Sequence, residues 1–226
     1  MKKKIVLIII VMTLLCCKDD KKQKELIISK KNTEVNKNNE PLSKFSVIGW
    51  RSNIVWRANR ILDSHSGKIT VNSGNMEMLG DQISSGVFNL DMNSLIVTNL
   101  KGKEKEELEL LLKGQIKGKE NIFFNTNEYP NATFEIVDSY FLNDSRYLSG
   151  DLTLNGITQI VEDFAVNFEN FEGDDSKIWL TSKNFEINRL DWNINYGSKT
   201  IEEDLVDEFI IRDKIKIRIK ILFNRL

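Results

Sequence analysis

The chain has 226 residues, of which 41% are hydrophobic, so it is long for one domain and short for two full ones. The formal net charge of −1 gives no electrostatic case for nucleic acid as a partner, which normally requires a basic face or stripe. The single histidine and the two adjacent cysteines exclude a zinc site built from His and Cys ligands. We therefore expect no metal, no cofactor and no nucleic-acid partner.

Residues 1–16 have the pattern of a signal peptide. Three lysines are followed by an uncharged run from Ile5 to Leu15. This run is about 11 residues long, whereas a membrane-spanning helix needs about 20. A short apolar run after basic residues is typical of a secretory signal.

The residues that end this segment resemble the lipidation motif of bacterial lipoproteins. Cys17 has Leu14 three positions before it and the small Cys16 directly before it, while Cys16 itself, preceded by Leu15, remains an alternative. A diacylated cysteine would supply the two-chain anchor that stable membrane attachment requires. The residues 18–20, Lys-Asp-Asp, resemble the tag that sends some lipoproteins to the outer face of the outer membrane. We expect a protein anchored to the outer membrane, on its periplasmic or its surface face.

The Lys- and Asn-rich residues 17–43 bury too little apolar area to offset their ordering entropy, and this predicts a tether. The remainder, 44–226, is predicted to be one domain. Its apolar residues alternate with period two, which indicates strands. The expected strands are 45–58, 67–79, 83–97, 131–141, 146–154, 160–170, 177–188 and 213–223.

The last predicted strand shows the alternation most clearly. Isoleucines at 215, 217, 219 and 221 alternate with lysine or arginine at 214, 216, 218 and 220. Such a strand has one dry and one wet face, as in antiparallel sheets. We interpret its cations as protection against edge-to-edge pairing.

One segment departs from the alternation. Residues 103–114 place Leu108, Leu111 and Leu112 on one helical face, with glutamates early in the segment and Gly114 as a stop signal. This predicts an amphipathic helix whose leucines lie on the barrel wall or across one mouth. Eight antiparallel strands can form a sandwich or a closed barrel, and only the barrel abolishes the sheet edges.

Five runs, in this order and spacing, resemble the YceI-like family of bacterial periplasmic proteins. The runs are VWRAN and SHSGKI within 55–69, GVFNLDMNSL (86–95), YPNATFEI (129–136), LSGDLTLNGITQIVEDFAVNF (148–168) and FEINRLDWNINYGS (185–198). The resemblance covers about residues 45–226 and implies an all-β fold with one helix, an eight-stranded antiparallel lipocalin-like barrel.

The resemblance also implies a function, because members of that family bind a long polyisoprenoid chain inside the barrel, often as dimers. It therefore implies a lipid partner and allows a homodimer. The inward positions expected to contact the lipid are Phe88, Leu90, Phe134, Ile136, Leu152, Leu154, Phe164, Val166, Phe168 and Ile187. The chain departs from the family pattern at Asn155, where histidine is frequent, and at Asn193, where glycine is frequent.

Two polar positions are candidate site residues. Arg189 and Asp191 could form a handle for a lipid head group at the barrel rim, or an ion pair that fastens a strand end. His65 follows Asp63 and Ser64, but three neighbouring residues cannot form a hydrolase triad, so we interpret His65 as a hydrogen-bonded turn residue at the mouth.

The sequence leaves two main hypotheses open. The first is a membrane-anchored, non-catalytic carrier that holds a polyisoprenoid or similar lipid. The second is an envelope interaction domain whose barrel is filled by its own side chains. A continuous apolar cavity of roughly 300 Å³ or more would favour the carrier, and a filled interior the scaffold. An enzyme is not expected, because no nucleophile–base set is visible.

Overall fold

The computed structural model describes residues 40–226. The predicted signal peptide, Cys17 and nearly all of the predicted tether lie outside the described residues. The first strand begins at Leu42, two residues before the predicted start of the domain. Within 40–226, no helix has the length and apolar character needed to cross a membrane.

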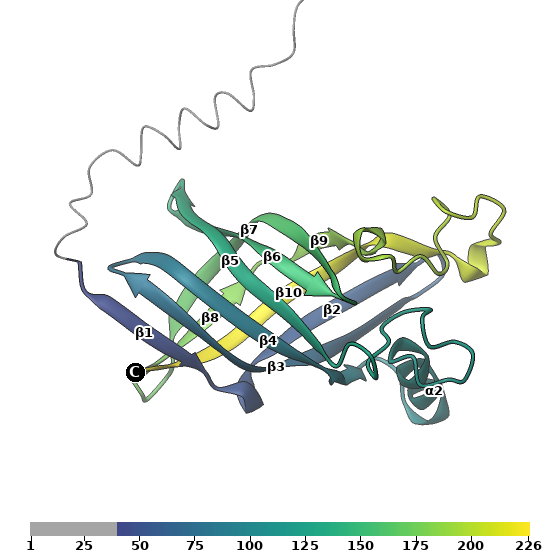
Figure 1. Cartoon of the computed structure of the whole chain (residues 1–226), viewed down its shortest axis with the longest axis horizontal. Coiled ribbons are helices and arrows are strands. Elements are labelled where there is room, and N and C mark those ends of the chain that lie inside the picture. Colours follow the sequence, from purple (N-terminus) through teal and green to yellow (C-terminus); the bar gives the residue numbers. More distant parts are fainter. Residues whose placement is uncertain (1–39) are drawn as a thin grey trace, which may run out of the picture. The chain divides into compact units, whose positions relative to one another are not determined.

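The domain is one antiparallel sheet that closes on itself, with a single α-helix at one end (Figure 1). Its strands are β1 (Leu42–Val47), β2 (Asn53–Arg60), β3 (Ser64–Leu79), β4 (Gln82–Val97), β5 (Asn131–Leu142), β6 (Ser145–Leu154), β7 (Ile157–Asn170), β8 (Lys177–Ser182), β9 (Phe185–Asn188) and β10 (Ile211–Arg225). Eight of them form a ring in the order β10-β2-β3-β4-β5-β6-β7-β8, and β8 pairs again with β10. The predicted eight-stranded fold class is confirmed.

Strand β10 closes the ring. One of its edges pairs with β2 and then β1, and the other pairs with β9 and then β8. The interpretation of its lysines as protection of a free edge is therefore wrong, because β10 has no free edge. Its isoleucines face the interior, as the alternation predicted.

Two of the predicted strands are each two strands. The run 45–58 is broken by the 3-10 helix η1 (Gly49–Arg51), where the backbone passes so close to β3 that a Cβ on Gly49 would lie 2.4 Å from the carbonyl oxygen of Asn72. The run 177–188 is broken after Ser182, whose Oγ accepts a hydrogen bond from the backbone N–H of Ile219 at 2.8 Å. In both cases the break depends on a neighbouring strand.

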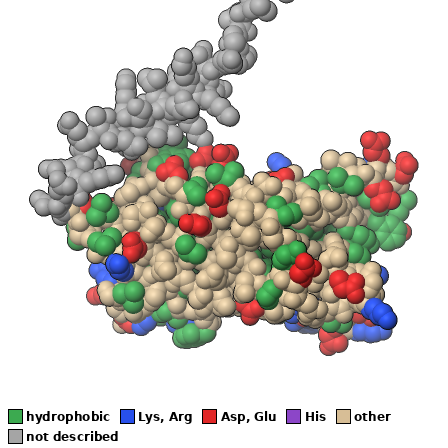
Figure 2. Space-filling view, viewed as in Figure 1, with side chains coloured by type: hydrophobic (Ala, Val, Ile, Leu, Met, Phe, Trp, Pro, Cys, Tyr) green, Lys and Arg blue, Asp and Glu red, His purple; other side chains and the backbone are tan. Residues whose placement is uncertain are grey.

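The predicted helix at 103–114 is confirmed as α2 (Gly102–Leu112), and Gly114 follows it with a φ of 69°. Helix α2 and the segment that contains η2 (Arg189–Trp192) and η3 (Asp207–Phe209) lie at one end of the ring, and the C-terminus lies at the other (Figure 1). Figure 2 shows acidic and hydrophobic side chains side by side on the end that carries this segment.

The interior of the ring is divided into two halves. The half away from α2 is filled by the protein's own side chains, all of them buried. They are Phe45, Met76, Met78, Ile83, Leu148, Val166, Leu180 and Phe223. These residues form one cluster with the wall of the α2 half, so a continuous apolar core runs through the ring.

Gly150 determines where the ring of Phe134 lies in this interior. A Cβ on Gly150 would be 2.3 Å from Cζ of Phe134 and 2.5 Å from the carbonyl oxygen of Glu135. A Cβ on Gly86 would instead come closer than 3.0 Å to one atom only, the terminal Cδ1 of Ile136, and this atom can rotate away.

We therefore expect Gly150→Ala to lower the free energy of unfolding by about 1–3 kcal/mol, the usual cost of overpacking. Gly86→Ala is the matched control and should cost clearly less. Urea unfolding of the two variants beside the wild type measures both values. Equal losses for the two variants would contradict the assigned contact between Gly150 and Phe134.

Candidate functional site

The half of the ring next to α2 contains a cavity of about 190 Å³. Its wall is made of inward side chains from β2 to β7, β9 and β10, together with residues of α2, η2 and the segment that follows α2. Apart from Arg60, His65 and Arg189, every lining residue is hydrophobic. The interior is thus neither filled nor as large as the roughly 300 Å³ of a typical ligand pocket.

Eight of the predicted site residues line this cavity: Phe88, Leu90, Phe134, Leu152, Leu154, Phe164, Ile187 and Arg189. The other three, Ile136, Val166 and Phe168, do not. Val166 is buried in the filled half, and Phe168 lies under the guanidinium of Arg146 at 5.0 Å. The strand parity was predicted correctly, but the position along the barrel axis was not, because both halves share the same alternation.

The floor of the cavity is a line of phenylalanines that crosses the interior, which we call the aromatic floor. Its members are Phe88, Phe134, Phe164 and Phe185. The ring centroids are 6.4 Å apart between Phe88 and Phe134, 5.7 Å between Phe134 and Phe164, and 4.4 Å between Phe164 and Phe185. Phe223 of the filled half continues the line at 5.8 Å from Phe88. An apolar ligand entering from the α2 end would meet this floor.

The mouth of the cavity is covered by Leu108 and Leu112 of α2, by Phe123 and by Trp192. The indole N–H of Trp192 donates to the carbonyl oxygen of Leu152 at 3.0 Å, which fixes this large side chain against β6. The carbonyl oxygen of Phe123 accepts from Nδ2 of Asn155 at 2.8 Å. The helix leucines were expected on the barrel wall or across one mouth; Leu108 and Leu112 line the cavity, and Leu111 does not.

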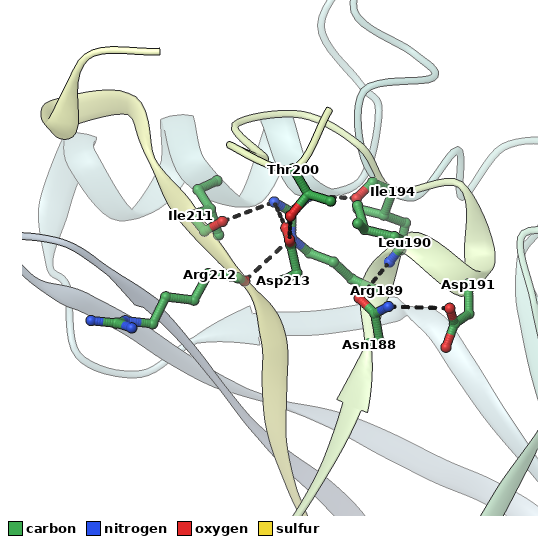
Figure 3. A network of polar contacts seen from close by, with 9 residues as sticks. All are labelled: Asn188, Arg189, Leu190, Asp191, Ile194, Thr200, Ile211, Arg212 and Asp213. Carbon is green, nitrogen blue, oxygen red and sulfur yellow. Dashed lines mark hydrogen bonds and ion pairs between the residues drawn. The ribbon is translucent and has the colours of Figure 1, made fainter. Parts of the chain in front are cut away.

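Arg189 is held in a network of the protein's own polar groups (Figure 3). Its guanidinium lies 3.1 Å from Oδ1 of Asp213 and also donates to the carbonyl oxygens of Ile194 and Ile211. Burial lowers the pKa of Arg189, and the nearby Asp213 raises it. Because these donors are occupied, Arg189 fastens the chain between β9 and β10.

The alternative pairing of Arg189 with Asp191 is wrong. Asp191 accepts instead from Nδ2 of Asn188 at 3.2 Å (Figure 3). Asn193, the next residue but one, has φ 56° and ψ 25°. Glycine adopts this left-handed conformation most readily, and asparagine next. This accounts for asparagine at a position where glycine is frequent in the family.

His65 and Trp56 are diagonal neighbours in the cavity wall, because Trp56 pairs with Gly67 and Ala58 pairs with His65. His65 lies in β3 rather than in a turn. Its buried Nδ1 has no hydrogen-bond partner among the described residues, and neither has the buried Nε1 of Trp56. The expectation of a hydrogen-bonded turn histidine is therefore wrong. Two polar atoms of the cavity wall are thus left without partners among the described residues.

The prediction missed other lining residues. Ile215, Ile217, Ile219 and Ile221 of β10 and Ile54, Trp56 and Ala58 of β2 form one wall of the cavity. The alternation of β10 was visible in the sequence and could have identified its isoleucines. Trp56 shares its strand parity with Ile54 and Ala58, which could have identified it too. Its ring lies over the backbone of Gly67, where a Cβ would come within 2.4 Å of Cζ2.

A second hollow of about 450 Å³ lies in the segment 195–209 and shares no lining residue with the first. It is a shallow surface depression between Tyr196, Ile201, Leu205 and Phe209, with Glu202 at its rim. Within 40–226, no group of three or more His, Cys, Asp and Glu side chains is arranged to hold a metal ion.

Comparison with known proteins adds a family to this geometry. Residues 45–223 match the sequence profile of the YceI-like domain. No curated protein matches the chain. A polyisoprenoid binding domain from Saccharophagus degradans, implicated in plant cell wall breakdown, has a TM-score of 0.56 at 13% identity, over 80% of this chain and 98% of that chain. A YceI protein of Campylobacter jejuni has a TM-score of 0.44 at 18% identity, over 63% of this chain and 72% of that one. The first likeness shows a shared fold.

His65 makes stability depend on pH. Its burial lowers the pKa of the imidazole more than the neighbouring Asp63 raises it. As the pH falls below about 6.5, the unfolded chain gains a proton that the folded chain takes up less readily, so stability is present above this pH and is lost below it. We expect the urea midpoint to fall between pH 7.5 and 5.5.

The variant His65→Gln removes the only histidine of the chain and is the control. Its urea midpoint should fall less over the same pH interval. An equal fall in wild type and variant would show that other groups, and not His65, carry the pH dependence.

Proposed function

Because the chain belongs to the YceI-like family, we propose that it is a non-catalytic lipid-binding protein that holds a polyisoprenoid or a similar long apolar chain in the α2 half of its barrel. The observation that supports this most is the cavity of about 190 Å³, whose wall is hydrophobic except for three residues. The structural neighbour from Saccharophagus degradans, described as a polyisoprenoid binding domain, supports the same ligand class.

The energetics of such a site need no charged recognition. Each CH₂ group that leaves water contributes about 0.8 kcal/mol, so a dry tube of aliphatic and aromatic side chains is sufficient to bind an oily tail. The isoleucines of β10 and the aromatic floor provide this surface. Selectivity among chains of similar girth would then be weak.

The volume sets a limit on how much of the ligand is enclosed. A cavity of about 190 Å³ is smaller than the roughly 300–1,000 Å³ that encloses a drug-sized ligand. We propose that one end of the chain enters past Leu108 and Leu112 and stops at the aromatic floor. The remainder of the chain extends beyond the mouth, or side chains of the floor move to admit it.

Attachment to a membrane belongs to the same proposal. The pattern around Cys17 supports a lipid anchor, and the residues that follow it support a place at the outer membrane, on the periplasmic or surface face. An anchored carrier would stay close to the bilayer from which it takes its lipid.

An enzymatic role is not proposed. His65 and Arg189 do line one cavity, but no carboxylate, hydroxyl or thiol side chain lines it with them. Asp63, beside His65, lies 3.4 Å from the guanidinium of Arg60. General acid–base chemistry requires a group that can take up or donate a proton within hydrogen-bond reach of a nucleophile, and the cavity wall offers no nucleophile.

The filled half of the barrel favours a second candidate, a scaffold without a lipid ligand. Met76 and Phe223 are fully buried there, and Phe45 nearly so, as in a conventional protein core. In this case the cavity would be an unfilled remainder of the core, and the loops at the α2 end would bind another protein.

The two candidates are separated by lipid extraction from protein purified out of its host membrane, followed by mass spectrometry. We expect a long-chain apolar lipid with the wild type. Ala58→Phe places a ring in the cavity and should reduce lipid occupancy at least severalfold without loss of stability. Ala165→Phe, on β7 and outside the cavity lining, is the control and should leave occupancy unchanged. Wild-type protein free of lipid would favour the scaffold.

The unpartnered Nε1 of Trp56 further favours a lipid that carries an oxygen acceptor, because an indole N–H can only donate. We expect an isoprenoid alcohol to bind more tightly than the matching hydrocarbon. One hydrogen bond contributes about 0.5–1.5 kcal/mol, which corresponds to an affinity about two- to tenfold higher. Trp56→Phe keeps an aromatic side chain without the N–H donor and should abolish this preference in a competition assay. If the variant kept the full preference, the ligand's oxygen would not be bound by Trp56.

A further inference from the structure

Six exposed cations lie on the outer surface of three adjacent strands, and we call this set the basic face. Its members are Arg57 of β2, Lys68 of β3, and Lys214, Lys216, Arg218 and Lys220 of β10. Lys216 lies directly opposite Arg57, and Val55 lies between Arg218 on one side and Lys68 on the other. From Lys214 to Lys220 the basic face extends about 20 Å, at about 3.3 Å per residue.

Few of these charges are neutralised by the protein. Nζ of Lys214 lies 3.9 Å from Oε2 of Glu186. Among residues 40–226, none of the other five cations has a carboxylate within ion-pair distance. Like charges directly opposite one another on neighbouring strands lower stability, so the pair Lys216–Arg57 has a cost, which Glu186, opposite Lys216 on β9, offsets in part.

The fold gives no structural reason for this cost. The lysines of a strand can protect an open sheet edge, but β10 is paired along both of its edges. Charge is separated within the domain. Residues 40–226 carry 22 Lys and Arg against 29 Asp and Glu, a net charge of −7, and five of the acidic residues are gathered in a different segment: Glu202, Glu203, Asp204, Asp207 and Glu208. A concentrated positive field on one face attracts an anionic partner.

An exposed aromatic residue is connected to the basic face. Trp50 of η1 is 83% exposed. The guanidinium carbon of Arg51 lies 5.2 Å from the ring centre of Trp50 and 5.9 Å from that of Trp179, and Nζ of Lys220 lies 4.5 Å from the ring centre of Trp179. These contacts place Trp50 next to the Lys220 end of the basic face.

We propose that the basic face and Trp50 form a docking surface for an anionic phospholipid bilayer. Lysine and arginine side chains near a bilayer are attracted by acidic head groups, and tryptophan is enriched at the membrane–water interface, where its ring is buried and its N–H stays hydrated. The exposed indole favours a bilayer over a soluble polyanion, which offers no such boundary. This surface acts independently of the cavity, so its failure would leave the proposed lipid binding unaffected.

The test compares two triple variants of the full chain, each with the same change in charge. The first is Lys216→Gln with Arg218→Gln and Lys220→Gln. The control is Lys101→Gln with Lys117→Gln and Lys119→Gln, three exposed lysines around α2. Binding is measured by co-sedimentation with vesicles of phosphatidylcholine alone and of phosphatidylcholine with about one third phosphatidylglycerol. A lipid anchor contributes equally to both vesicle types, so the ratio of the two affinities is the readout.

We expect the wild type and the control to prefer the anionic vesicles, and this preference to weaken with salt. In the first triple variant, the ratio of the affinities for anionic and neutral vesicles should fall about a hundredfold at low ionic strength, because each cation near the surface contributes about fivefold to binding. Trp50 emission should shift to shorter wavelength on anionic vesicles, a shift absent from Trp50→Phe. An equal fall in this preference in both triple variants would overturn the proposal. Binding of polyphosphate as tight as the binding of anionic vesicles would also overturn it, in favour of a soluble polyanion.

Discussion

The structure depends on the closure of the sheet at β10. This strand pairs with β2 and β1 on one edge and with β9 and β8 on the other, so neither of its edges is left unpaired. Closure satisfies the backbone N–H and C=O groups of the strands and encloses the inward side chains within the sheet. The strict alternation of β10 then puts isoleucine inside and cations outside, so one strand contributes both to the cavity wall and to the basic face.

The second constraint is the packing of aromatic rings on glycines. Gly150 leaves the space that the ring of Phe134 occupies, and Gly67 does the same for Trp56. The phenylalanines of the aromatic floor, from Phe88 to Phe185, then cross the interior of the closed sheet and separate its filled half from its α2 half. A closed sheet alone would not determine whether the interior is open. The position of these rings leaves a cavity at one end and a solid core at the other.

Much of the fold followed from the sequence because a period of two residues is a local property. The alternation of residues 213–223 and the leucine spacing of α2 predicted these elements nearly to their ends. The breaks at Gly49 and after Ser182 were missed, since each depends on a contact with a distant strand, at Asn72 and Ile219. For the same reason Arg189 was given the wrong carboxylate: Asp191 is near in sequence, whereas Asp213 is near in space. Parity predicted which residues face inward, but not which half of the interior they occupy, and so Val166 and Phe168 were assigned to the cavity with Phe164.

The proposed binding of lipid requires that the α2 half of the barrel takes up an apolar chain. The most direct test is a crystal structure of the protein purified from its host with bound material retained. We predict continuous tubular electron density that enters beside Leu112, runs along the isoleucines of β10 and ends at the rings of Phe134 and Phe164. A structure in which Leu108, Phe123 and their neighbours have closed into this space and no such density is present would contradict the account.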